Sequence, residues 1–340
     1  MERFERGTTA NRNLWEPTYL QLARRPFAMR STRLFRSAPT ALFCLPTGPR
    51  APAVLQVAML VLPFGVGLAA DDASAPVDLQ YKLVPGQKVV TRVEHYAETY
   101  TIMAEQQERG YSRTVTQKTW QVERATADGH FTFVYSIDWV QLAQSVGEAE
   151  EISYDSRQEQ EVPPMFRAVA ETVGTPLARV TIDRYGRVIE RDKTFGAPNL
   201  GMGELTVPLP GKPVRVGDSW DVEREARAQL DDGTYKRIKL REHYTLEKVS
   251  SGVASIRVDS QPLTPITSPA VESQIIQQLS HGVIKFDIDR GLVISKHLEW
   301  DEEVVGFRGP NTSLRYDAKF VETLQPESLQ SARGKTTQKR

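Results

Sequence analysis

The stretch Val180-Thr181-Ile182-Asp183-Arg184-Tyr185-Gly186-Arg187-Val188-Ile189 returns further along the chain as Phe286-Asp287-Ile288-Asp289-Arg290-Gly291-Leu292-Val293-Ile294. In both copies, apolar and polar residues alternate, break at an Asp-Arg-(Tyr)-Gly sequence and alternate again. Alternation of this kind is typical of a strand that buries one face, and the glycine supplies the positive φ that the turn requires. The sequence therefore predicts two equivalent β-hairpins and, with them, an internal duplication.

The same order of elements precedes both hairpins. Strand-like runs and a short helix at 163–174 come before the first hairpin, and two further runs and a helix at 268–282 come before the second. Each helix begins near a proline and ends at a glycine, and we expect Ser268 to cap the second helix. This repeated order of strands, helix and hairpin supports the duplication more strongly than any single match.

The strongest strand signal lies at 131–139, where a period of two is expected to place alternate residues on one face. Weaker alternating runs at 79–84 and 313–324 are also expected to be strands, and the acidic run at 148–161 is expected to be a solvated loop. The predicted fold class is therefore mainly β, a curved antiparallel sheet or half-barrel. It is built from two tandem pseudo-repeats, each with one short helix.

Five segments follow from these patterns. Residues 195–213 are rich in glycine and proline, which is typical of a seam between repeats. The end of the chain is polar and basic and is expected to be disordered. The predicted segments are a signal peptide with an over-long leader at 1–70, a first β repeat at 77–194, the seam at 195–213, a second β repeat at 214–325 and the tail at 326–340.

The beginning of the chain has the charge order of a secretory signal. Residues 1–50 carry nine arginines and three glutamates, and residues 51–70 carry no charge. Small residues follow, so we expect cleavage near Ala69 and Ala70 and an exported protein, periplasmic or extracellular, with no stable membrane span. Two alternatives stay open. In the first, translation starts at Met29 and the leader is shorter. In the second, residues 51–70 are not cleaved and serve as a membrane anchor.

The charge balance and the single cysteine exclude several kinds of site. The whole chain carries 43 basic and 43 acidic side chains, so the part after the basic leader is mildly acidic. This disfavours nucleic-acid binding, which uses a basic surface. Cys44 precedes the apolar run and would leave with the signal, so the mature protein has no thiol for a disulfide, a zinc–thiolate site or a nucleophile.

Short structural motifs resemble those of a known group of proteins. The motifs are Pro85-Gly86-Gln87, the Val-Gly-Asp-Ser-Trp sequence at 216–220 and the two hairpins. Over about residues 77–325 the chain resembles uncharacterised exported bacterial proteins built on duplicated antiparallel β units. The resemblance implies that fold and an extracytoplasmic location, without catalytic residues. A more distant similarity is to the half-barrels of periplasmic lipoprotein carriers, in which a sheet folds over one or two helices.

Catalytic motifs are not found in the sequence. His95, His130, His243, His281 and His297 have no metal-binding spacing, and the sequence contains no nucleophile elbow and no phosphate-binding glycine loop. Asp183 and Asp289 occupy matching turns, where an aspartate side chain is expected to bond the local backbone. We therefore expect a non-enzymatic protein that uses no cofactor and no metal.

The apolar face of the run at 131–139 carries the binding hypotheses. Its side chains either fill the core between sheet and helices, or line an apolar cleft there that holds a lipid or another apolar small molecule. The candidate ligand-binding residues are Phe131, Phe133, Tyr135, Trp139, Phe166 and Ile275. The sequence thus predicts an exported protein that binds an apolar or amphipathic ligand. The alternative is a structural or protein-interaction component of the cell envelope.

Overall fold

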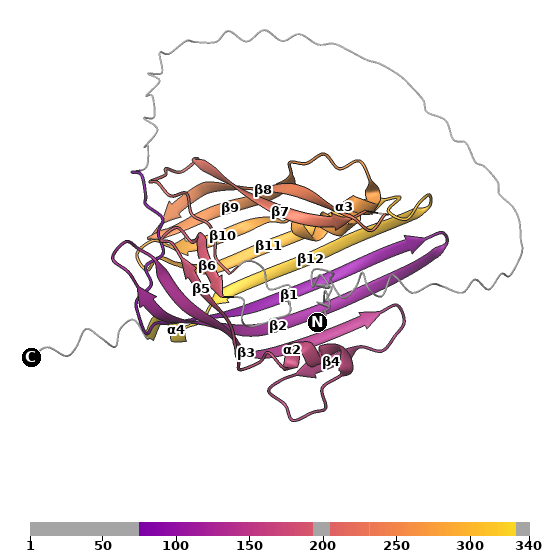
Figure 1. Ribbon diagram of the computed structural model, residues 1–340, viewed down its shortest axis with the longest axis horizontal. Coiled ribbons are helices and arrows are strands. Elements are labelled where there is room, and N and C mark those ends of the chain that lie inside the picture. Colours follow the sequence, from indigo (N-terminus) through magenta and orange to yellow (C-terminus); the bar gives the residue numbers. More distant parts are fainter. Residues whose placement is uncertain (1–74, 193–204, 231, 331–340) are drawn as a thin grey trace, which may run out of the picture. The chain divides into compact units, whose positions relative to one another are not determined.

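A computed structural model of the protein describes residues 75–192, 205–230 and 232–330 (Figure 1). The predicted leader at 1–70 and the first part of the predicted seam lie outside these residues. One antiparallel sheet of 12 strands dominates the fold. Its strands are β1 (Lys88–Met103), β2 (Gln106–Ala125), β3 (Phe131–Val146), β4 (Ile152–Asp155), β5 (Pro176–Ile182), β6 (Val188–Asp192), β7 (Ser219–Gln229), β8 (Tyr235–Ser250), β9 (Val253–Pro262), β10 (His281–Asp287), β11 (Leu292–Val305) and β12 (Thr312–Leu324).

The strand order repeats within the sheet. The path runs β6-β5-β3-β2-β1-β12-β11-β10-β9-β8-β7, and β4 pairs with β3 beside it. The order β6-β5-β3-β2-β1 therefore returns as β11-β10-β9-β8-β7, with β12 between the two sets. The sheet does not close, because its path ends at β6 and β7. The predicted mainly β, curved antiparallel sheet is thus confirmed.

The turns that lead into β1 and β7 have matching hydrogen bonds. The Gly86 amide donates to the Val122 carbonyl, and the Gly217 amide donates to the Leu246 carbonyl, both at 2.8 Å. In each turn a side chain also accepts from the backbone three residues earlier. The Gln87 side chain accepts from the Val84 amide, and the Asp218 carboxylate accepts from the Arg215 amide. Two different sequences thus build the same turn.

The segment before β1 crosses both predicted hairpins. The Tyr81 amide donates to the Arg184 carbonyl at 2.8 Å, and the Lys82 amide donates to the Gly291 carbonyl at 3.2 Å. Residues 79–84 were predicted to form a strand, but their amides bind these turns and the segment has no strand assignment. Leu79 and Tyr81 are nevertheless buried. The segment therefore joins the two equivalent hairpins instead of extending the sheet.

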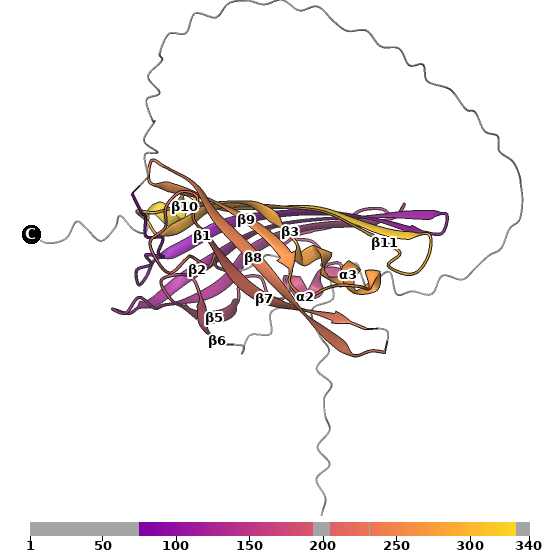
Figure 2. The same cartoon turned by 90° about the horizontal axis from the view of Figure 1, so that it is seen from above.

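Short helices lie on one side of the sheet, the side toward which its two ends curve (Figure 2). In the first set, a 3-10 turn, η1 (Pro164–Phe166), leads into α2 (Arg167–Ala170). In the second set, α3 (Pro269–Ile275) leads into η2 (Ile276–Gln278). Pro269 begins α3 as predicted, but the Ser268 side chain makes no capping hydrogen bond. We call this side of the sheet the concave face.

Two predicted irregular segments contain regular structure. The acidic run at 148–161 includes β4, because Tyr154 and Asp155 pair with β3 and are buried. The predicted disordered tail begins with α4 (Glu327–Gln330), where the Ser328 hydroxyl bonds both backbone groups of Val90. In the described part of the chain, no helix is long and apolar enough to cross a membrane.

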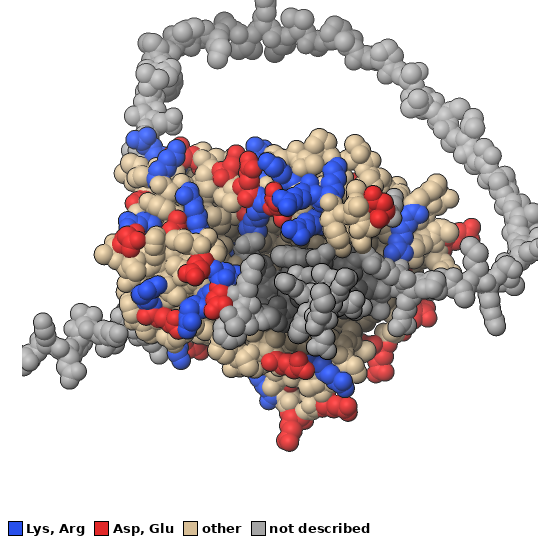
Figure 3. Space-filling view, viewed as in Figure 1, with Lys and Arg blue, Asp and Glu red and all other residues tan. Residues whose placement is uncertain are grey.

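Opposite charges face each other along β7, one of the two ends of the sheet. Glu223 and Glu225 lie within 4 Å of Lys239 and Arg237 on β8. Figure 3 shows basic side chains gathered over β7 and β8 with acidic side chains among them. Charged side chains on an edge strand oppose its pairing with another sheet. This end is therefore poorly suited to strand-by-strand association.

Candidate functional site

Residues 205–209, here called the strap, lie over the concave face and are bonded to both ends of the sheet. The Thr206 hydroxyl donates to the Gly186 carbonyl, and the Leu209 amide donates to the Tyr185 carbonyl, in the turn between β5 and β6. The Trp220 indole on β7 donates to the Pro208 carbonyl at 3.0 Å. The strap therefore connects strands that are far apart in the sheet order.

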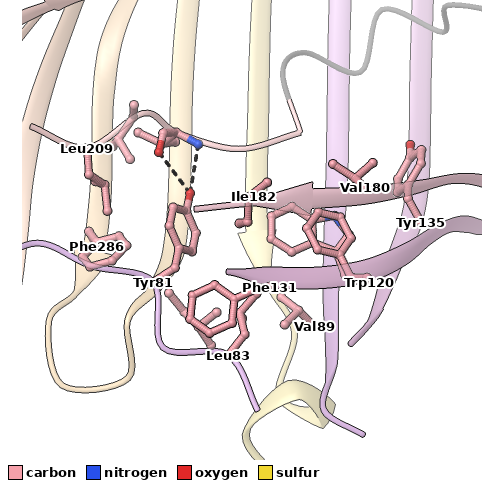
Figure 4. Packing of buried hydrophobic residues seen from close by; sticks show 14 of the residues in the cluster. Tyr81, Leu83, Val89, Trp120, Phe131, Tyr135, Val180, Ile182, Leu209 and Phe286 are labelled. Carbon is pink, nitrogen blue, oxygen red and sulfur yellow. Dashed lines mark hydrogen bonds between the residues drawn. The ribbon is translucent and has the colours of Figure 1, made fainter. Parts of the chain in front are cut away.

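Tyr81 holds the middle of the strap. Its hydroxyl accepts from the Val207 amide at 2.9 Å and donates to the Val207 carbonyl at 3.3 Å (Figure 4). The ring packs edge-on against Phe286 in the main hydrophobic core. Burial raises the pKa of Tyr81, so this hydroxyl stays protonated and keeps its donor. One buried tyrosine thus satisfies both backbone groups of a strap residue.

A small pocket, part of it open to solvent, lies between the strap and the central strands β2, β1, β12 and β11. Most of its wall is apolar, which is typical of pockets that bind small molecules. Polar groups are confined to a few positions. The wall is formed by Tyr81, Val89, Thr91, Trp120, Leu205, Thr206, Val207, Leu292, Val293, Ile294, Lys296, Glu322 and Leu324.

Buried charges lie at one side of the pocket, where Lys296 and Glu322 line it. The Lys118 ammonium lies 2.8 Å from the Glu322 carboxylate, and Lys296 lies opposite Glu322 in the register of β11 and β12. The three side chains are nearly inaccessible, with exposed fractions of 1% for Lys118, 6% for Lys296 and 8% for Glu322. Charged residues are rarely buried to this degree unless they are paired. We call this trio the charged cluster.

The electrostatics of the charged cluster favour an ionised glutamate. Burial alone would raise the pKa of Glu322, but the ammoniums of Lys118 and Lys296 and hydrogen bonds from Lys118 and Thr91 outweigh it and lower that pKa. A lowered carboxyl pKa means that the carboxylate persists in the folded protein at neutral pH. The cluster is therefore two lysines around one carboxylate in a poorly hydrated place.

Three of the predicted ligand-binding residues are core residues next to the pocket. Phe131, Phe133 and Tyr135 lie on one face of β3, as predicted, and are buried in the main hydrophobic core. None of them lines the pocket. Phe133 stacks on Trp120 with ring centroids 4.5 Å apart, and Trp120 does line the pocket. The predicted apolar face therefore supports the pocket wall from behind.

Trp139 does not lie on that face, so its predicted placement is wrong. Ile137 pairs with Lys118 and Trp139 pairs with Gln117, which marks a bulge at Asp138. An extra residue in one strand moves the following side chains to the other face. Trp139 therefore lies on the opposite face, where its ring faces the guanidinium of Arg157 at 4.1 Å.

Phe166 and Ile275 pack in two separate places. Phe166, beside α2, is buried near Tyr154 of β4, with ring centroids 6.5 Å apart. Ile275 of α3 packs with Ile238 and Leu240 of β8 in another cluster. The structure thus does not bring the six predicted residues together, and none of them lines the pocket.

The polar turn residues have local structural roles. One Asp183 carboxylate oxygen accepts from the amides of Tyr185 and Arg187, which confirms the prediction for this turn. In the second turn it is Asp287, not Asp289, whose carboxylate accepts from the Arg290 amide. Among the described residues, no group of three His, Cys, Asp or Glu side chains could hold a metal ion.

The charged cluster had a signal in the sequence that was missed. In a strand with a period of two, Lys118 shares a face with Thr116, Trp120 and Val122. In the same way, Glu322 shares a face with Phe320 and Leu324. A charged residue at an inward position of an apolar strand face is a candidate functional or paired group. The strap had no comparable signal, because glycine- and proline-rich composition does not indicate what the segment covers.

Comparisons with known proteins find similarity to solved structures. No family model and no curated protein matches the chain. A solved structure described as lipid–protein interactions in lipovitellin is similar over 72% of this chain, with 10% sequence identity and a TM-score of 0.43. The match covers 25% of that chain, so this chain spans about a quarter of its length.

Proposed function

We propose that this protein is an exported, non-catalytic binding protein for an amphipathic ligand, which it holds in the pocket beneath the strap. The observation that carries the proposal is a mainly apolar pocket with charged residues confined to one part of its wall. Apolar walls with a few placed polar groups are typical of sites that bind small molecules.

The strap gives the pocket a cover that is fixed at several points. Hydrogen bonds that involve the side chains of Tyr81, Thr206 and Trp220 hold it to the segment before β1, to the turn after β5 and to β7. Because the strap is already held in place, less conformational entropy is lost when a ligand binds beneath it. The export part of the proposal is supported by the charge order of residues 1–70.

Binding of a neutral, polarity-sensitive dye tests the proposal. The delipidated protein is titrated with Nile red, and a variant with Leu205→Trp is compared with a variant with Leu263→Trp. Leu205 lines the pocket, whereas Leu263 is an exposed residue after β9, 41% accessible. We expect saturable fluorescence enhancement in the wild type and in Leu263→Trp, and loss of about tenfold or more in affinity in Leu205→Trp.

Two results would contradict the proposal. The first is the absence of saturable dye binding to the folded wild-type protein. The second is equal binding to Leu205→Trp and Leu263→Trp, which would place the dye elsewhere. Either result would favour the alternative of a structural or protein-interaction component of the envelope that binds no ligand.

A further inference from the structure

We infer that the outer edge of β6 is a strand-addition site, which binds an extended segment of another protein with a carboxylate opposite Arg191. No residue of β6 lines the pocket, so this surface goes beyond the proposed function. In the described part of the chain, the sheet path ends at β6 and no strand pairs with its outer edge. Val188 and Ile189 are 50% and 53% exposed there. Exposed β-branched residues on an edge strand favour pairing with a further strand.

The second half of the sheet shows what such an edge receives. In the repeated strand order, β11 is the equivalent of β6, and β12 pairs with its outer edge. Both strands have a bulge at an isoleucine, Ile189 in β6 and Ile294 in β11, and the ladder with the preceding strand resumes at the next residue. Counted from this bulge, Arg191 corresponds to Lys296. The edge of β6 is therefore the counterpart of an edge that carries a strand.

Lys296 gives the register of the added strand. It lies opposite Glu322 of β12, one residue after the antiparallel ladder begins at Ser295. Arg191 lies opposite Val180 of β5, which is buried in the main hydrophobic core. Because opposite residues of an antiparallel pair project from the same face, Arg191 projects from the concave face as Lys296 does. A strand added to β6 in the same register thus places its own acidic residue opposite Arg191.

Arg191 makes this edge selective. Opposite charges across a strand pair stabilise it, whereas like charges destabilise it. An added strand with a basic residue at this position is therefore rejected, and one with a carboxylate is favoured. A second copy of β6 fits less well, because the antiparallel register that places Glu190 opposite Arg191 also places Asp192 opposite Ile189. The favoured occupant is a segment of another protein with alternating apolar residues and one carboxylate.

A synthetic peptide tests the inference on the full-length protein. The probe is a fluorescein-labelled peptide with the sequence of residues 318–325, which contains Glu322. Fluorescence polarisation should show saturable binding, and Glu322→Gln in the peptide should weaken it about threefold. N-methylation of alternate residues should abolish binding in one phase and leave it intact in the other, because only alternate amides of a strand face a given neighbour.

Variants of the protein locate the binding. Arg191→Glu should weaken binding about tenfold, since attraction is replaced by repulsion, and a peptide with Glu322→Lys should restore it. Arg227→Glu is the matched control, because Arg227 is exposed on β7, at the other end of the sheet, and this variant should bind as the wild type does. Hydrogen exchange of residues 188–192 should be fast in the free protein and slower when the peptide is saturating.

Several results would overturn the inference. They are the absence of saturable peptide binding, equal affinity of the wild type for the peptide and its Glu322→Gln form, and equal binding by the wild type and Arg191→Glu. Slow exchange of residues 188–192 in the free protein would mean that the edge is already covered. A dimer that Arg191→Glu dissociates would mean that the occupant is a second copy. Nile red binding does not depend on β6, so each of these results leaves the proposed function standing. The two peptides decide the question on the wild type even where Arg191→Glu does not fold.

Discussion

The Lys118 ammonium lies 2.8 Å from the Glu322 carboxylate, although β1 separates their strands. Both side chains project from the concave face, and only 1% of the Lys118 side chain and 10% of the Glu322 side chain are exposed. A buried pair of this kind adds little to stability compared with apolar residues, but its disruption is costly because a charge is left uncompensated. Disruption of the pair should therefore be felt at Glu322, which lines the pocket.

Removal of the shared carboxylate should destabilise the fold. Glu322→Gln leaves the ammoniums of Lys118 and Lys296 without their common counter-ion, and we expect a loss of about 3–5 kcal/mol in the free energy of unfolding. Urea denaturation measures this change. In the double variant Lys118→Met/Glu322→Gln, part of the loss should be recovered. Simple addition of the two single effects would show that the residues are not coupled.

Two groups should make the protein less stable in acid, in different pH windows. Burial lowers the pKa of His95 to about 4, from an ordinary value of 6.5. Because the unfolded chain binds a proton first, the contribution of neutral His95 is complete above pH 6.5 and is lost as the pH falls toward 4. The pKa of Glu322 is lowered from an ordinary value of 4.5, so the contribution of its carboxylate to stability is lost as the pH falls below 4.5.

Melting temperatures from pH 7.5 to 3.5 separate these two windows. His95→Phe should flatten the decline between pH 6.5 and 4, by about 3 °C relative to the wild type. Glu322→Gln should change the slope only below about pH 4.5. Identical pH profiles for wild type and His95→Phe would exclude a neutral His95 in the folded protein.

The two hairpin glycines should tolerate no side chain. A Cβ at Gly186 would lie 2.6 Å from the Val207 carbonyl oxygen, and one at Gly291 would lie 2.4 Å from the Lys82 amide nitrogen. Both residues also have positive φ, 80° and 64°. We expect each change to alanine to lower the free energy of unfolding by about 2–4 kcal/mol, from backbone strain together with overpacking.

Gly233→Ala is the control for these two changes. Gly233 has a similar φ of 81° but no atom within 4 Å of the added Cβ. Its substitution therefore reports backbone strain alone, about 1–2 kcal/mol. Equal losses at the three positions, measured by urea denaturation, would mean that the segment before β1 does not pack on the hairpins.

Removal of the Tyr81 hydroxyl should loosen the strap. Tyr81→Phe leaves the buried Val207 backbone groups without a partner, at an expected cost of about 1–3 kcal/mol. Hydrogen exchange of residues 205–209 should become faster, while exchange in β1 and β12 stays slow. Tyr235→Phe is the control, because Tyr235 is 49% exposed. Unchanged exchange in the strap would show that Tyr81 does not hold it.

Short-range patterns predicted much of the fold. The repeated hairpins at 180–189 and 286–294, the two helices and the alternating runs indicated a mainly β fold with two similar halves. The strand order now shows the same succession in both halves. These features depend on turn residues and on a hydrophobic period of two, and both are determined by residues that are close together in the sequence.

Long-range features were not predictable in the same way. The bulge at Asp138 moves Trp139 to the opposite face, and period alone does not reveal where a strand gains an extra residue. The pocket depends on the strap, which is separated in sequence from the strands that it covers. Lys118 on β2 and Glu322 on β12 are brought together across β1, which lies between their strands. The residues around either one in the sequence do not indicate its partner.

Tryptophan quenching by a monoacylglycerol with a brominated acyl chain tests the central proposal most directly. Bromine quenches an indole by contact, and Trp120 lines the pocket whereas Trp139 lies on the opposite face. If the ligand occupies the pocket, saturable quenching should be seen in the wild type and in Trp139→Phe, and most of it should be lost in Trp120→Phe. Nile red binding would confirm that Trp120→Phe keeps its pocket. Quenching that survives in Trp120→Phe and disappears in Trp139→Phe, or no saturable quenching at all, would contradict the proposal that the pocket beneath the strap binds the ligand.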